Sequence, residues 1–296
     1  MRHFLEVDDL SPDELMRVLD LAVVENPAQV LSGQGAALVF MKPSLRTRNS
    51  MERAVQQLGG HPVAIGADEV GIDTRETAED VALTLSQFHS IVAARVFEHR
   101  VLERMAAVAT VPIVNLLSDA AHPMQALADL LTIRNHFGKL EGLTVAYIGD
   151  GNNVCRSLMV AAGMAGMIGR VATPPGYDLG EAEMDHLRGL GMAIDATHVA
   201  REAVDGADIV YTDVWTSMGQ EAESEQRFRD FEHFTIDSQL MSAARPEAVL
   251  MHCLPAHRGE EIAADVLEGP QSLVWPQAQN RMHAARGLLL FLLGQQ

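Results

Sequence analysis

Basic residues are scarce in this sequence, which has 22 lysines and arginines against 40 aspartates and glutamates and a net charge of −18 at pH 7. A protein with this balance repels nucleic acid and anionic membrane surfaces at long range, because both carry dense negative charge. We therefore expect neither as a partner. A small anion held in a local basic pocket is still compatible with this charge.

Cysteine and long apolar runs are also in short supply. The two cysteines, Cys155 and Cys253, cannot make a disulfide framework, which favours a reducing cytoplasm. The stretch MRHFLEVDDL at the amino terminus is acidic and has no apolar run of signal-peptide length. The longest apolar stretches, such as 288–293, are too short to cross a bilayer. We expect a soluble cytoplasmic protein.

What the sequence does contain is a regular alternation of apolar runs with helix-like segments, which predicts parallel sheets covered by helices on both faces. The fold class expected is α/β, with two doubly wound parallel-sheet domains and a cleft between them. The expected strands are 36–41, 62–65, 91–94, 111–116, 143–148, 170–173, 207–212, 248–253 and 273–275. The expected helices are 12–24, 49–58, 77–88, 102–109, 123–137 and 277–293.

A domain boundary is expected just after the helix that Pro123 opens, where Gly138 and Gly142 follow. The sequence thus predicts a first domain at 1–137 and a second at 138–276. The final segment, 277–296, contains the apolar run GLLLFLL, and we expect this helix to return and pack on the first domain.

The stretch FMKPSLRTRNS at 40–50 crowds Lys42, Arg46 and Arg48 into seven positions. Ser44 stands where a helix N-cap belongs, and a helix start attracts anions through its free N–H groups and its dipole. Arg46 adds planar, bidentate donors suited to phosphate oxygens. The spacing is not that of a Walker P-loop. The plainer alternative is an arginine-rich helix start paired with surface acids.

Other polar stretches follow the expected strands, at the edge where open parallel sheets bind ligands. His122 and Gln125 begin a helix and offer donors to a carbonyl or phosphate oxygen, or His122 simply caps that helix. Asp213 can bind an ammonium group or cap a helix. GDGNN at 149–153 lacks the third glycine and the distant acid of a dinucleotide fingerprint, so a nicotinamide cofactor is not expected.

The histidines around Cys253 raise the question of a metal. His252, Cys253 and His257 match no standard zinc spacing, so no metal site and no cofactor are predicted. Cys253 is more readily a polar contact or a proton acceptor than a covalent nucleophile, because no base partner is evident.

Taken together and in order, SLRTR, HPMQ, GDGNN, DVWTSMGQE, HCLPAHRGEE and QAQNRMHA resemble the transcarbamylases across essentially the whole chain. The SMG and HCLP segments resemble the ornithine branch of that family. The resemblance implies an enzyme of arginine metabolism, with arginine biosynthesis as the expected role: carbamoyl phosphate and L-ornithine give L-citrulline and phosphate. It also implies a homotrimer with sites near subunit boundaries.

The resemblance further implies roles for individual residues. The catalytic group would be Arg95, His122, Asp213 and Cys253. Carbamoyl phosphate would be bound by Ser44, Leu45 (through its backbone), Arg46, Thr47, Arg95, His122, Gln125, Cys253, Leu254 and Arg281. Ornithine would be bound by Asn153, Asp213, Ser217 and Met218.

Four positions depart from the family pattern. Leu45 replaces the first threonine of the usual STRTR, and Met124 occupies the middle of HPMQ. Gly71 stands where relatives carry a glutamine that reaches a neighbouring subunit's phosphate, and Gln279 stands where glutamate is common. Two alternatives stay open: a transcarbamylase for another amine, such as putrescine or an N-acylated ornithine, and a catalytically silent relative that binds a phosphorylated metabolite.

Overall fold

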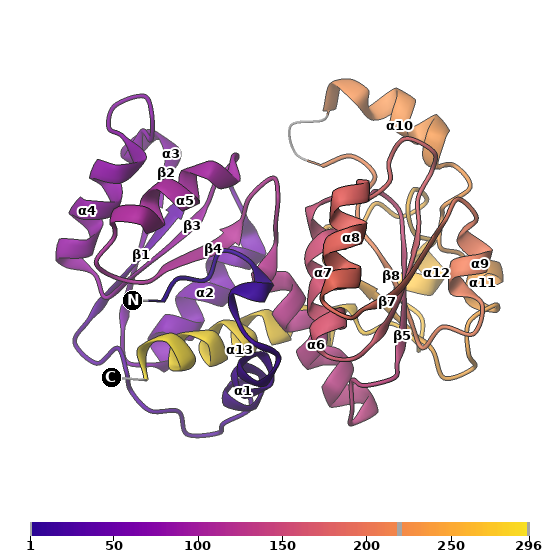
Figure 1. Cartoon of the computed structure of the whole chain (residues 1–296), viewed down its shortest axis with the longest axis horizontal. Helices are drawn as coiled ribbons and strands as arrows, with labels where there is room; N and C mark the ends of the chain where they lie inside the picture. Colours follow the sequence, from indigo (N-terminus) through magenta and orange to yellow (C-terminus); the bar gives the residue numbers. More distant parts are fainter. Residues whose placement is uncertain (1, 218–220, 295–296) are drawn as a thin grey trace. The chain divides into compact units, whose positions relative to one another are not determined.

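The computed structural model describes residues 2–217 and 221–294. The chain folds into two compact units: unit 1 is Met1–Leu131 with Gln279–Gln296, and unit 2 is Thr132–Ala278. Both are parallel α/β structures, as the alternation of apolar runs predicted (Figure 1). The divisions fall inside two helices, α6 (Pro123–Phe137) and α13 (Val274–Leu293).

Unit 1 is built on a parallel sheet with the strand order β2-β1-β3-β4. Its strands are β1 (Gly35–Phe40), β2 (His61–Gly66), β3 (Ile91–Arg95) and β4 (Ile113–Leu117). The inner strands β1 and β3 are buried almost throughout, which explains why their sequences are continuously apolar rather than alternating. The elements around this sheet are η1 (Val7–Asp9), α1 (Pro12–Ala22), α2 (Leu45–Gln57), α3 (Ala67–Val70), α4 (Ala78–Phe88), α5 (His99–Val108) and the first part of α6.

The last helix returns to unit 1, as the sequence predicted. Most of α13, drawn in yellow in Figure 1, belongs to this unit. Gly287 allows the close approach, because a Cβ there would lie 2.4 Å from the carbonyl oxygen of Val18 on α1. Arg286 then donates to the carbonyl of Ala22 at 2.6 Å, at the carboxyl end of α1, where a cation is favoured.

Unit 2 is built on a parallel sheet with the strand order β7-β6-β5-β8-β9. Its strands are β5 (Thr144–Ile148), β6 (Ile168–Ala172), β7 (Ala193–Thr197), β8 (Ile209–Thr212) and β9 (Val249–His252). The surrounding elements are α7 (Asn153–Met164), α8 (Glu181–Gly189), α9 (Ala200–Val204), η2 (Glu221–Glu223), α10 (Ser224–Phe231), α11 (Ser238–Met241) and α12 (Ala264–Leu267).

The strand predicted at 273–275 was wrong. Ser272 makes a single bridge to Leu250, and α13 already begins at Val274. Pro276 lies in the first turn of that helix, where its missing N–H costs nothing, whereas it could not donate to a sheet. The edge strand β7 was not predicted, because its sequence AIDAT is short and largely exposed.

Both sheets reverse their strand order once. The switch lies between β1 and β3 in unit 1, and between β5 and β8 in unit 2. Ligands of open parallel sheets bind beyond the carboxyl ends of the strands at such switch points. Among the described residues, no helix has the length and apolarity needed to cross a membrane.

Candidate functional site

In unit 1 the first candidate feature is the start of α2, directly after β1. Ser44 is the N-cap, as predicted: its backbone is extended, and its hydroxyl accepts from the Thr47 N–H at 3.3 Å. The remaining N–H groups of this first turn and the helix dipole favour an anion. Leu45, the first residue of α2, is 76% exposed.

The three cations of this stretch have different surroundings. Arg48 is exposed and pairs with Glu52 one turn along α2 at 2.8 Å. The Lys42 ammonium lies 4.2 Å from the centroid of the Phe97 ring. Only Arg46 contributes to the electrostatics of the buried His122. The simpler alternative, an arginine at a helix start paired with a surface acid, therefore describes Arg48. Arg46 belongs to a different cluster.

That cluster is centred on the imidazole of His122, which lies just before α6. Arg46 from α2, Arg95 at the end of β3 and Arg281 from α13 all act on it electrostatically. Burial first, and then these three guanidinium groups, hold the pKa of His122 well below its usual value. His122 is consequently neutral at pH 7 and can donate one N–H while three permanent cations surround it. We call these four residues the arginine cluster.

Hydrogen bonds fix the geometry around Arg281. One nitrogen of its guanidinium donates to the Thr47 hydroxyl at 3.0 Å, and another donates to the Gln125 side-chain oxygen. Gln125 in turn donates to Asp129 at 2.8 Å, one turn along α6. Thr47, Gln125 and Arg281 are all at least 96% buried, so these donors are held rigidly. Such an array can stabilise a dianion and charge that develops on a neighbouring oxygen.

In unit 2 the candidate features gather around Asp213, directly after β8. One carboxylate oxygen accepts from the Val214 N–H at 2.8 Å and from the Cys253 thiol at 2.9 Å. The other accepts from the Asn152 side-chain amide at 3.1 Å. Val214 does not begin a helix, so Asp213 is not a helix cap. Asp213 and Cys253, two of the predicted site residues, are therefore in direct contact.

The two asparagines after β5 have different positions. Asn153 is the first residue of α7 and is half-buried. Asn152 is the N-cap, whose oxygen accepts from the Val154 and Cys155 N–H groups while its amide donates to Asp213. The sequence singled out Asn153 and missed Asn152, although the paired asparagines at a strand end were the available signal. Ser217 is half-buried, and Met218 lies outside the described residues.

A second residue that sequence reasoning missed is Arg227 on α10. Its guanidinium donates to Asp150 at 2.7 Å and to the carbonyl of Trp215 at 2.9 Å. Burial raises the pKa of Asp150, and the bond from Arg227 opposes that change. Arg227 thereby ties the polar turn after β5 to the segment that follows Asp213.

Two groups of possible metal ligands lie near the end of β9. The first group is Asp213, His252 and Cys253, and the second is His257, Glu260 and Glu261. Within each group the possible ligand atoms lie within 4.8 Å of one another. In the first group the thiol donates to Asp213, and both ring nitrogens of His252 have protein partners. The side chains of this first group are already hydrogen-bonded within the protein, and a cation could bind there only by breaking those hydrogen bonds.

The departure from the family pattern at Gly71 has a local conformational explanation. Gly71 ends α3 in the left-handed conformation, with φ +56° and ψ +41°, which favours glycine. A Cβ there would lie 2.8 Å from the Arg75 side chain. Any residue with a longer side chain would need this turn to change.

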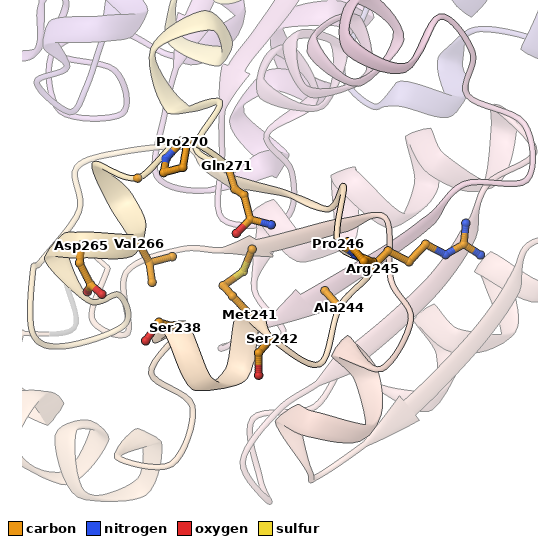
Figure 2. Close-up of a pocket in the computed structure, with 11 residues that line it drawn as sticks. Ser238, Met241, Ser242, Ala244, Arg245, Pro246, Asp265, Val266, Pro270 and Gln271 are labelled. Atoms are coloured by element: carbon orange, nitrogen blue, oxygen red, sulfur yellow. The ribbon is translucent and has the colours of Figure 1, made fainter.

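Unit 2 also holds a hollow of about 410 Å³, whose lining residues are shown in Figure 2. It is lined by residues such as Met241, Pro246 and Gln271, and none of the predicted site residues takes part. Pro246 precedes β9, so the hollow lies toward the amino ends of the strands, opposite Asp213 and Cys253. It is separate from the candidate site.

Comparisons with known proteins cover nearly the whole chain. Residues 2–135 match the family model "Aspartate/ornithine carbamoyltransferase, carbamoyl-P binding domain", and residues 141–292 match "Aspartate/ornithine carbamoyltransferase, Asp/Orn binding domain". The chain is 47% identical to an ornithine carbamoyltransferase of Parafrankia sp. (99% of this chain, 96% of that protein) and 48% identical to one of Thermus thermophilus (99% and 97%). A solved ornithine carbamoyltransferase of Pyrococcus furiosus superposes with a TM-score of 0.95 at 41% identity, covering 100% of this chain and 98% of the other.

Proposed function

Since the chain belongs to the aspartate/ornithine carbamoyltransferase family, we propose that it transfers the carbamoyl group of carbamoyl phosphate to the δ-amine of L-ornithine. The products are L-citrulline and phosphate, and the role is arginine biosynthesis. Both substrates are small molecules, and the expected domains are 1–137 for carbamoyl phosphate and 138–276 for ornithine, with 277–296 returning to the first domain.

The observation that carries the proposal is the arginine cluster beside the capped start of α2. Ser44, Arg46, Thr47 and the backbone at Leu45 bind the phosphate, whose two negative charges offset the crowded guanidinium groups. Arg281 holds Thr47 and Gln125 in place and adds its own charge. A protein with a strongly negative net charge can thereby contain a local, positively charged binding site for a dianion.

Arg95, His122 and Gln125 hold the carbamoyl group. The amine attacks the carbamoyl carbon, and negative charge develops on the carbonyl oxygen before the bond to phosphate breaks. Thr47, Arg95 and neutral His122 are donors already in place for that charge. The leaving phosphate keeps its partners, and much of the rate comes from holding two reactants in position.

Ornithine binds at Asn153, Asp213, Ser217 and Met218, with the Asp213 carboxylate accepting from the α-ammonium. The attacking δ-amine must be neutral, so it loses a proton before it attacks. Asp213 and Cys253, joined by a hydrogen bond of 2.9 Å in which the thiol donates, assist in that proton loss: the thiol passes its proton to the Asp213 carboxylate as the sulfur takes one from the amine. Leu254 contacts carbamoyl phosphate. An N-acylated ornithine would leave Asp213 without its charge partner.

The family resemblance also supports a cytoplasmic homotrimer with sites near subunit boundaries. Multi-angle light scattering of the purified protein measures the assembly directly. A mass three times that of one chain is the expected result, and a monomer would remove the intersubunit part of the proposal.

The test of the reaction is citrulline formation by the purified protein with carbamoyl phosphate and L-ornithine, beside putrescine and N-acetylornithine. Turnover with ornithine alone is expected. Turnover with another amine only would keep the arginine cluster as the phosphate site and overturn the role of Asp213. The absence of turnover with every amine would overturn the reaction and favour a silent phosphometabolite-binding protein.

A further inference from the structure

The imidazole of His252 lies directly behind the Cys253–Leu254 segment. It is fully buried, as is the carboxylate of Glu261 beside it. The His252 Nδ1 accepts from the backbone N–H of Leu254 at 2.8 Å. The His252 Nε2 lies 3.0 Å from the Glu261 Oε1. One ring therefore connects a buried carboxylate to the backbone of the segment predicted to line the reacting centre.

These two contacts determine where the ring proton is. An N–H group can only donate, so Nδ1 must present a lone pair to Leu254. The single ring proton is then on Nε2, which donates to Glu261. Protonating Nδ1 would place two donors against each other and would release the Leu254 N–H. The bond to Leu254 thus requires neutral His252 in one tautomer, and Glu261 selects that tautomer.

Glu261 is itself held in place. The same Oε1 accepts from the His257 N–H at 2.6 Å. The Glu261 carbonyl accepts from the Ile236 N–H at 2.9 Å, which fixes its backbone. On the other side, the Gln277 side chain accepts from the backbone N–H of His252 at 2.9 Å. The imidazole therefore sits in a rigid frame and cannot turn toward a substrate.

The backbone that this frame holds is strained. Leu254 has φ +60°, a left-handed conformation that is unfavourable for leucine. Such a conformation persists only where the surroundings over-determine it. The peptide between Cys253 and Leu254 is planar, so when its N–H points at His252 its carbonyl oxygen points the opposite way. The Cys253 carbonyl is thereby directed away from the buried ring.

We propose that Glu261 and His252 are positioning residues for the reaction: Glu261 fixes the tautomer of His252, and His252 holds the Leu254 N–H so that the Cys253–Leu254 backbone faces the substrates. Neither side chain touches substrate. This inference rests on the proposed function, because it assigns the reacting centre to Cys253 and Leu254.

Two variants of His252 separate its bond to the Leu254 N–H from its contact with Glu261. In His252→Asn the side-chain oxygen replaces Nδ1 and can still accept from Leu254, while the contact with Glu261 is lost. In His252→Gln the amide reaches the position of Nε2, and no acceptor remains for Leu254. Both variants bring in the same chemical group, so they form a matched pair. We expect H252N to keep kcat within a few fold of the wild type and H252Q to lose about 10²-fold, as for a misplacement on the order of 1 Å.

The affinity for inorganic phosphate, measured by calorimetry, should be unchanged in both variants, because the arginine cluster lies in unit 1. A purely structural role would lower the melting temperature of both and leave kcat per folded molecule equal, which would overturn the proposal. If wild-type protein forms no citrulline, the proposed function fails instead.

Hydrogen exchange of a peptide spanning 250–256, read by mass spectrometry, tests the contact without turnover. The Leu254 amide should be slow to exchange in the wild type and H252N and fast in H252Q; equal exchange in all three overturns the proposal. Should the His252 variants not fold, Glu261→Gln and Glu261→Met replace them. Gln keeps a strong acceptor for the His252 Nε2–H, whereas the thioether of Met is only a weak one. E261M should therefore be the slower enzyme, and equal kcat values in the two overturn the proposal.

Discussion

The guanidinium of Arg281 donates to the hydroxyl of Thr47 over 3.0 Å, across 234 positions of sequence. The last helix thus supplies a cation to the first turn of α2, which is capped by Ser44. The same guanidinium reaches Gln125, so a single side chain joins α2, α6 and α13 beside the arginine cluster. In the proposed site Arg281 adds charge toward the phosphate, and its hydrogen bonds hold the side chains of Thr47 and Gln125 in place.

Replacing Arg281 with lysine keeps the charge and removes the fork that reaches Thr47 and Gln125 at once. We expect the KM for carbamoyl phosphate to rise by about 10- to 10²-fold, which corresponds to roughly 1.5–3 kcal/mol for bonds to a charged group. The measurement is initial rate against carbamoyl phosphate at saturating ornithine. Arg53→Lys, an exposed arginine of α2, is the control and should behave as wild type. A KM near the wild-type value in R281K would remove Arg281 from the site.

Replacing Asp213 with asparagine removes the carboxylate that accepts from Asn152, Val214 and Cys253. We expect kcat/KM for ornithine to fall by about 10²-fold or more, roughly 3 kcal/mol, as when one partner of a buried charge pair is lost. Inhibition by the product phosphate should be unchanged, because the proposed phosphate site is in unit 1 and Asp213 is in unit 2. Asp185→Asn, on the exposed face of α8, is the matched control. Loss of phosphate inhibition in D213N would indicate general misfolding instead.

The pH dependence of stability follows from His122, whose folded-state pKa is well below 6.5. The unfolded chain takes up a proton below about pH 6.5, while the folded state does not until the pH reaches the lowered value. Stability from neutral His122 is therefore present above pH 6.5 and is lost as the pH falls, by up to about 1.4 kcal/mol per pH unit. Urea unfolding at pH 7.5, 6.5 and 5.5 measures this slope.

The comparison with His122→Asn isolates the contribution of this residue. Three other histidines also have lowered pKa values through burial and add to the wild-type slope: His3, His89 and His283. In H122N the pH dependence of the unfolding free energy that comes from these three histidines should remain. The part that corresponds to one bound proton should be lost. Identical slopes in the two proteins would mean that His122 is not kept neutral by folding.

The two cysteines should differ in reactivity. Burial raises the pKa of the Cys155 thiol well above its usual value, whereas Cys253 is only half-buried. Because the thiolate is the reactive form, iodoacetamide at pH 7.5 should modify Cys253 alone, with activity lost in parallel. Peptide mass spectrometry locates the label. Cys155→Ala should be modified at the wild-type rate, and labelling of Cys155 in the native protein would contradict the burial argument.

Much of the arrangement could be predicted because it depends on local chemistry. Ser44 was identifiable as an N-cap from its place before a helical run, and the buried strands β1 and β3 from their unbroken apolar sequences. Periodicity alone did not find β7, since an exposed edge strand has no buried face to leave a pattern. The prediction of a strand at 273–275 was wrong because these apolar residues suit a strand and a helix equally well. They in fact begin α13, with Pro276 in its first turn.

Partners that come together only in the folded chain were beyond reach. Nothing near Asp150 in the sequence points to Arg227, 77 positions away, and nothing near Leu254 shows that its N–H is bound by a histidine two residues earlier. The split of Lys42, Arg46 and Arg48 is of the same kind. All three are cations in one short stretch, and their surroundings in the folded chain distinguish them: Arg48 pairs with Glu52, Lys42 lies over Phe97, and Arg46 acts on His122.

The carboxyl edges of both sheets carry the proposed chemistry, and this leaves the turns that lead into the strands available to the protein engineer. A Cβ placed at Gly33 before β1, Gly142 before β5 or Gly191 before β7 would meet no atom within 4 Å. All three glycines are exposed and have positive φ, +72°, +74° and +83°, so added chain should follow each glycine and should not replace it. A fluorescent reporter or an affinity peptide spliced in at Gly191 would be carried by the edge strand β7, on the side of the sheet remote from Asp213.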